Sequence, residues 1–241
     1  MYLTGYVATV VAAGGLALWG SGAHDPTLGA LALLFWFLAN LLGEVLWLPA
    51  PRGRGYLSMA TAANFATLVL LPAFPAVAIT SMAGLVADLI FRRRRWYQAL
   101  FNGAMCCVTV AVAAWVFHRA GGSSASLETL VSPLNVAPLG LAAVTYFLIN
   151  TWLVSGVISL HGRLPVWTVW RTSFAFSYGL VGILMLNLLG FVFAILFLTW
   201  GYMSAFLAVI ATYFVRDAYV RYVMQLEGAG AQPEAPTGRT S

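Results

Sequence analysis

Four consecutive arginines, Arg92, Arg93, Arg94 and Arg95, interrupt an otherwise apolar stretch that runs from residue 84 to residue 102. Adjacent guanidinium groups cannot lie in hydrocarbon, and each is attracted to the anionic cytoplasmic leaflet by about 1 kcal/mol. An aromatic pair, WY, follows directly, and such side chains concentrate at membrane interfaces. We therefore predict that the arginine run is a basic anchor at the cytoplasmic surface and sets the orientation of the chain.

The composition around this run is that of a membrane protein. Hydrophobic residues make up 61% of the chain and charged residues only 8%, far from the average of soluble domains. Lysine is absent, which excludes retinal Schiff-base and lysine-nucleophile chemistry. The sequence lacks the basic patch with interleaved aromatic residues that would indicate a nucleic-acid partner. The sequence predicts an all-α fold, a polytopic transmembrane helix bundle, and not an enzyme.

About eight apolar segments are predicted to enter or cross the membrane. They cover residues 2–19, 28–48, 57–71, 74–91, 99–117, 138–160, 172–190 and 191–214. The third and fourth are separated by Pro72 and Pro75, and each is shorter than the ~20 residues of a full span. The stretch 57–91 is therefore either two short spans or a re-entrant hairpin.

The last two segments are predicted to reverse near Gly190, because glycine is common at turns. We expect residues 1–227 to form a single membrane domain. Residues 228–241 are rich in Gly, Ala and Pro and are expected to be a disordered cytoplasmic tail.

The arginines test this topology. Eleven of the twelve fall on one predicted side, and only Arg119 falls on the other. The eleven are Arg52, Arg54, Arg92, Arg93, Arg94, Arg95, Arg163, Arg171, Arg216, Arg221 and Arg239. Basic residues accumulate in cytoplasmic loops, so both termini are predicted to be cytoplasmic.

Two acids lie near the cytoplasmic ends of predicted segments. Glu44 lies one helical turn before the end of the second segment, and Asp88 lies four residues before Arg92 in the fourth. These acids either pair with Arg54 or the arginine run and hold the helix ends together, or they contact a ligand or couple to a cation. No nucleophile or phosphate-binding loop accompanies them, so hydrolysis is disfavoured.

Four asparagines lie inside apolar segments, where lipid cannot satisfy their amides. These are Asn64, Asn102, Asn150 and Asn187. They are expected to face the protein interior, together with small and polar residues at helical spacing. Two interpretations stay open: a close-packed, hydrogen-bonded helix interface, or a polar ligand cavity between the helices.

Cysteine and histidine indicate no further chemistry. Cys106 and Cys107 are adjacent, which argues against a structural disulfide between them. His24 and His118 are predicted on one side of the membrane and His161 on the other, so they cannot share a metal ion. We predict no metal site and no cofactor.

Several stretches resemble the N-terminal multi-span membrane module of bacterial signalling proteins, which precedes HD-GYP or GGDEF output domains. They are GEVLWLPAPRGRGYLS at 43–58, GLVADLIFRRRRWYQALFN at 84–102 and AAVTYFLINTWLVSGVISLHGRLPVWTVWR at 142–171. The resemblance implies a sensor or signal relay in the bacterial inner membrane. It carries over Glu44, Asp88, Asn102 and Asn150 as candidate ligand-binding or bundle-core residues.

The chain departs from this pattern because it stops after the last predicted span, so any output domain is expected to belong to a separate cytoplasmic partner. The segment 57–91 is also similar to a unit of the substrate-binding subunits of energy-coupling-factor transporters, which would imply an ATPase partner and a small-molecule substrate. A scaffold subunit of a membrane complex is the third hypothesis. Every one of these hypotheses includes contact with the lipid bilayer.

Overall fold

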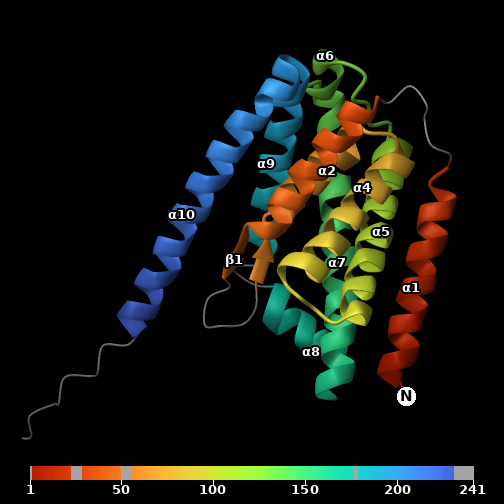
Figure 1. Cartoon of the computed structure of the whole chain (residues 1–241), viewed down its shortest axis with the longest axis vertical. Helices are drawn as coiled ribbons and strands as arrows, with labels where there is room; N and C mark the ends of the chain where they lie inside the picture. The colour runs from red at the N-terminus through yellow and green to blue at the C-terminus, as the bar shows by residue number, and fades with distance from the viewer. Residues whose placement is uncertain (1, 23–28, 50–55, 176–178, 231–241) are drawn as a thin grey trace, which may run out of the picture.

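The computed structural model describes residues 2–22, 29–49, 56–175 and 179–230, which form a helix bundle with a short β-hairpin (Figure 1). The α-helices are α1 (Tyr2–Gly20), α2 (Ala30–Val45), α3 (Ala60–Leu70), α4 (Ala73–Val86), α5 (Trp96–Arg119), α6 (Leu127–Leu130), α7 (Val136–Gly162), α8 (Val166–Trp170), α9 (Gly179–Trp200) and α10 (Ser204–Gly230). Turns of π-helix or 3₁₀-helix cover Ala87–Phe91, Pro133–Asn135, Arg171–Ala175 and Gly201–Met203. The strands are β1 (Trp47–Pro49) and β2 (Tyr56–Ser58).

Five stretches of the described chain are long and apolar enough to cross a membrane. They are Tyr2–Gly20, Ala73–Phe91, Trp96–Arg119, Pro133–Gly162 and Gly182–Met203. The helices α2 and α3 are apolar but shorter, and α10 is not among the five. The prediction of a polytopic all-α bundle is confirmed at this level, and the number of eight segments stays a prediction.

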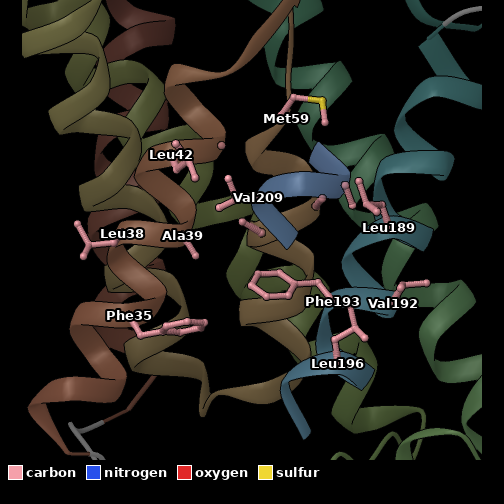
Figure 2. A pocket seen from close by; sticks show the side chains of 14 residues that line it. Phe35, Leu38, Ala39, Leu42, Met59, Leu189, Val192, Phe193, Leu196 and Val209 are labelled. Carbon is pink, nitrogen blue, oxygen red and sulfur yellow. The ribbon is translucent and has the colours of Figure 1, made fainter. Parts of the chain in front are cut away.

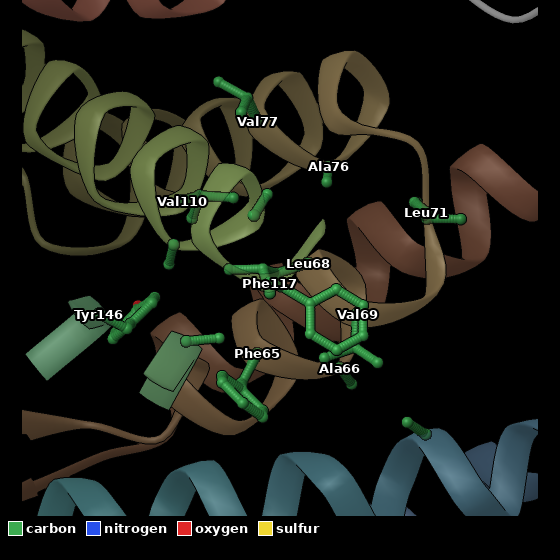
Figure 3. Packing of buried hydrophobic residues seen from close by; sticks show 14 of the residues in the cluster. Phe65, Ala66, Leu68, Val69, Leu71, Ala76, Val77, Val110, Phe117 and Tyr146 are labelled. Carbon is green, nitrogen blue, oxygen red and sulfur yellow. The ribbon is translucent and has the colours of Figure 1, made fainter. Parts of the chain in front are cut away.

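The centre of the bundle is α3. Every residue from Ala60 to Val69 is buried, and α2, α4, α5 and α9 all contact this helix. Phe65, Leu68 and Val69 belong to one apolar cluster with Val110 and Phe117 of α5 (Figure 3). Thr61, Asn64 and Thr67 of α3 are buried as well, and buried polar side chains need protein partners that lipid cannot provide. Because protein surrounds α3, its 11 residues need not match the thickness of the bilayer.

The turn between α3 and α4 lies at the end of the bundle opposite the arginine run. The hydroxyl of Ser124, which follows α5, donates a hydrogen bond of 2.6 Å to the carbonyl of Val69. Since α5 starts next to Arg95 and ends at Arg119, this contact places the end of α3 beyond the far end of α5. The chain from α3 to α4 therefore runs from one end of the bundle to the other and back, which favours two short spans over a re-entrant hairpin.

A two-stranded hairpin, which we did not predict from the sequence, follows α2. We expected helix up to residue 48, but α2 ends at Val45, and β1 pairs antiparallel with β2 from Trp47↔Ser58 to Pro49↔Tyr56. The prolines at 49 and 51 do not continue a helix. The hairpin returns the chain directly to the start of α3. Arg52 and Arg54 lie in residues 50–55, outside the described part of the chain.

The prediction of a reversal at Gly190 is wrong. α9 continues from Gly179 to Trp200, and the chain turns at Gly201, whose φ of +57° suits glycine. Gly190 lies where α9 crosses α3, because a Cβ at this position would clash with the carbonyl oxygen of Ala62 and lie 3.0 Å from the Cβ of Phe65. Glycine is required here for close approach of two helices. α10 extends to Gly230, and residues 231–241 lie outside the described chain, so the disordered tail stays a prediction.

Gly190→Ala should destabilise the protein by about 1–3 kcal/mol, because the new methyl group overpacks the α3–α9 contact. Gly140→Ala is the matched control, since a Cβ at Gly140 on α7 would meet nothing within 4 Å and alanine favours helix. Thermal unfolding in detergent micelles measures both variants. Equal stability of the two variants would contradict the close contact.

Candidate functional site

The end of α4 is built to bring charged residues together. The α-helix ends at Val86 and continues as a π-helical turn, Ala87–Phe91. The backbone N–H of Arg92 donates to the carbonyl of Ala87 at 3.0 Å, and that of Arg94 donates to the carbonyl of Asp88 at 2.8 Å. Arg93 lies between them with a φ of +49°, which reverses the chain. Single π-turns of this kind are frequent at functional sites.

Arg92 bridges both predicted acids. Its Nη1 lies 2.8 Å from Oδ1 of Asp88, and its Nη2 lies 2.7 Å from Oε2 of Glu44. The same Nη2 donates to the main-chain carbonyl of Glu44 at 2.5 Å. The side chain of Asp88 is 1% exposed, so this carboxylate depends on the arginine for neutralisation.

Three more side chains complete the ionic cluster. Nε of Arg94 lies 3.4 Å from Asp88, and the amide of Asn102, on α5, donates to Oδ2 of Asp88 at 2.5 Å. The hydroxyl of Ser58, at the end of β2, donates to Oε2 of Glu44 at 3.1 Å. We call Glu44, Ser58, Asp88, Arg92, Arg94 and Asn102 the ionic cluster. It joins α2, β2, the π-turn and α5, and its two acids and two arginines balance in charge.

The electrostatics of the cluster favour a permanently charged Arg92. Burial of its guanidinium lowers the pKa, but the Glu44 carboxylate and the hydrogen bonds to Asp88 and Glu44 raise the pKa further, so the net pKa lies above its ordinary value. Of the two alternatives for the acids, the structure therefore supports pairing with the arginine run. Arg93 and Arg95 are exposed, and Arg95 donates to the Tyr97 hydroxyl at 3.1 Å.

The asparagines mostly bond to neighbouring helices. The Asn64 amide donates to the Tyr146 hydroxyl at 3.0 Å, and the Asn187 amide donates to the carbonyl of Ala143 at 3.4 Å. Asn150 is half-buried on α7, and no hydrogen bond joins its side chain to another described residue. These contacts have the character of a hydrogen-bonded helix interface. A ligand-binding role for Asn64, Asn102 and Asn150 stays a prediction.

A second feature, an apolar pocket of about 300 Å³, lies between α2, α3, α9 and α10 (Figure 2). Its lining contains no charged or hydrogen-bonding side chain. The lining residues are Phe35, Leu38, Ala39, Leu42, Gly43, Met59, Ala62, Ala63, Leu189, Val192, Phe193, Leu196, Val209 and Ala211. Sequence reasoning missed this pocket, because apolar residues on apolar helices carry no distinguishing pattern. The small residues Ala39, Gly43, Ala62 and Ala63 were the available signal.

The pocket adjoins the ionic cluster through the chain itself. Gly43 and Met59 line the pocket, and they are the direct neighbours in the chain of Glu44 and Ser58. Gly43 also sets the spacing of α2 and α3, since a Cβ here would lie 2.7 Å from the Cα of Ala60. The end of α2 and the start of α3 therefore position both the pocket and the ionic cluster.

Arg92→Ala should destabilise the fold by about 3 kcal/mol, because it leaves Asp88 buried without its closest counter-charge. Arg92→Lys should recover only part of this loss, since one ammonium cannot reproduce the fork that reaches both acids. Arg93→Ala is the matched control, because Arg93 is exposed and forms no ion pair with any described residue. Thermal unfolding in lipid nanodiscs is the measurement, and equal losses for Arg92→Ala and Arg93→Ala would contradict the role of Arg92.

Comparison with known proteins agrees with this architecture. The family model MASE9 matches residues 59–221, which is more than half of the chain and includes α3 to most of α10. No curated protein and no solved structure matches the chain. The matching family is a sensor domain, and no catalytic domain was identified. The resemblance seen in the sequence is confirmed: the chain belongs to the MASE9 family of membrane-associated sensor domains, the N-terminal sensor modules of bacterial signalling proteins.

Proposed function

We propose that this chain senses a change inside the membrane and relays it to its cytoplasmic face through the hairpin and α10. The observation that carries the proposal is a continuous path of contacts. α10 contacts β1, β1 pairs with β2, and Ser58 at the end of β2 bonds Glu44. Glu44 is held by Arg92, so the last helix is connected to the ionic cluster.

The ionic cluster makes this path responsive to helix movement. A shift of α2 against α4 would break the bond from Arg92 to Glu44 or the bond to Asp88. An unpaired charge at a buried position costs several kcal/mol. The helix ends are therefore expected to move together, and Ser58 transmits the movement to the hairpin. Small interface shifts of this type are a common form of switching.

The arginine-rich end of the bundle is the proposed cytoplasmic side of a bacterial inner membrane. The arginine run precedes α5, Arg163 follows α7, and Arg171 begins the π-turn after α8. The start of α5, the end of α7 and the short helix α8 lie at one end of the bundle (Figure 1), and basic residues next to these helix ends agree with the positive-inside rule. α10 ends on the same side, where it would meet a cytoplasmic signalling partner.

A substrate-binding transport subunit with an ATPase partner, or a scaffold subunit, stays an alternative prediction. A transport subunit for a polar small molecule requires a pocket with polar groups that fix its substrate. The pocket found among the described residues is apolar, and no contact in the described chain favours transport. The relay is therefore the function that the geometry supports best.

The relay predicts that weakening the cluster moves α10. Spin labels at Leu100→Cys on α5 and Met224→Cys on α10, both exposed, would report the distance between the helices by pulsed electron resonance in nanodiscs. Cys106 and Cys107 are first replaced by alanine. Ser58→Ala removes the hydrogen bond to Glu44 and the one that the Ser58 hydroxyl accepts from the backbone N–H of Ala60. It should shift or broaden the distance distribution by about 2 Å or more.

Arg93→Ala is the control and should leave the distribution unchanged, since Arg93 lies outside the path. Arg92→Ala should give a larger change than Ser58→Ala wherever it stays folded. An unaltered distribution in a folded Ser58→Ala protein would refute the relay, whatever ligand the bundle binds.

A further inference from the structure

The apolar pocket opens on the outer surface of the bundle. Its rim includes Leu38, Leu42 and Val192, which are 51%, 38% and 42% exposed. Its floor is closed by Ala62 and Ala63, which are 8% and 7% exposed. The pocket is therefore a recess that runs from the lipid-facing side of α2 and α9 inward to α3.

The rim continues a stripe of leucines along α2. Leu31 and Leu34 precede Leu38 at helical spacing and are 63% and 52% exposed. In a multi-pass membrane protein such a stripe contacts acyl chains. Whatever reaches the pocket thus comes from the hydrocarbon region and not from water.

The lining selects against polar ligands. A polar group placed among these side chains would lose hydrogen bonds to water without replacement. Binding pockets for polar molecules contain a few polar groups that fix orientation, and none of the lining side chains can provide one. At about 300 Å³ the pocket is at the small end of the range for ligand sites, so it has room for a single chain and not for a whole lipid.

We propose that the pocket binds one acyl chain of a membrane phospholipid, inserted between α2 and α9. Val209 and Ala211 of α10 cover this site, so an inserted chain contacts the proposed output helix. Gly43 and Met59, which also line the pocket, precede and follow the cluster residues Glu44 and Ser58. Binding of an acyl chain is independent of the proposed relay. Its signalling consequence rests on the proposed function: the relay would then respond to the state of the acyl chains.

Acyl chains gain little hydrophobic energy by leaving lipid for protein, so contact shape decides occupancy. Filling the pocket should therefore exclude the chain. Ala39→Leu and Val192→Phe each add bulk at the lining, and both positions are partly exposed, which limits strain on the core. Ala12→Leu is the matched control for Ala39→Leu, because it makes the same substitution at an exposed position of α1.

The test uses the full chain in nanodiscs that contain a phospholipid with a diazirine group in mid-chain. After illumination, mass spectrometry should find pocket residues such as Leu42, Val192 and Val209 labelled more than exposed residues of α1. Pocket labelling should fall about tenfold, equivalent to about 1.4 kcal/mol, in Ala39→Leu and Val192→Phe, and stay unchanged in Ala12→Leu.

Two outcomes would overturn the inference. Pocket labelling equal to that of α1 and insensitive to folded Ala39→Leu and Val192→Phe would mean ordinary boundary lipid. Labelling by a free diazirine fatty acid but not by the phospholipid would assign the pocket to a different ligand. The spin-label distances test the relay independently of the acyl-chain site. If Ser58→Ala moves α10 but the pocket is not labelled, the acyl-chain site is refuted and the relay is not.

Discussion

Neutralisation of charge at the edge of a hydrocarbon layer is the constraint on which this structure depends. Asp88 is almost fully buried, and it is tolerated because Arg92 and Asn102 provide nearby donors. The same guanidinium also holds the carboxylate and the main-chain carbonyl of Glu44. The Arg92 side chain thus fixes the end of α2 against the end of α4, and Asn102 adds the start of α5 through its bond to Asp88.

Polar and apolar parts of the bundle have separate roles. Polar side chains bond to each other across helices, as in the pairs Asn40–Thr67 and Asn64–Tyr146, and they hold α3 to α2 and to α7. Open space lies elsewhere, among alanines, leucines and phenylalanines at the lipid-facing side. This separation suits the proposed sensor: the apolar pocket can respond to the bilayer, while the hydrogen-bonded polar side chains keep the helix packing fixed.

Sequence patterns predicted what depends on composition, charge and local spacing. The helical bundle and the interruption at Pro72 follow from composition and local spacing. Pairing of the two acids with the arginine run was one of two alternatives that the sequence left open. Features set by helix–helix approach were not predictable. Gly190 was predicted as a turn because the sequence alone does not distinguish a glycine at a helix crossing from a glycine that ends a helix. Only the position of Ala62 against Gly190 distinguishes them. The apolar pocket depends on residues of four helices, α2, α3, α9 and α10, which no local window contains.

The enclosure of α3 also constrains how the protein is made. During synthesis the translocon releases segments into lipid in chain order, yet α3 is an 11-residue helix with Thr61, Asn64 and Thr67 on its surface, poorly matched to lipid by itself. Its neighbour α9 emerges more than a hundred residues later. Until then α3 must be sheltered by α2, α4, α5 and α7, with one side still open. Biogenesis therefore has a late closing step, in which α9 docks on the side of α3 that earlier helices leave uncovered.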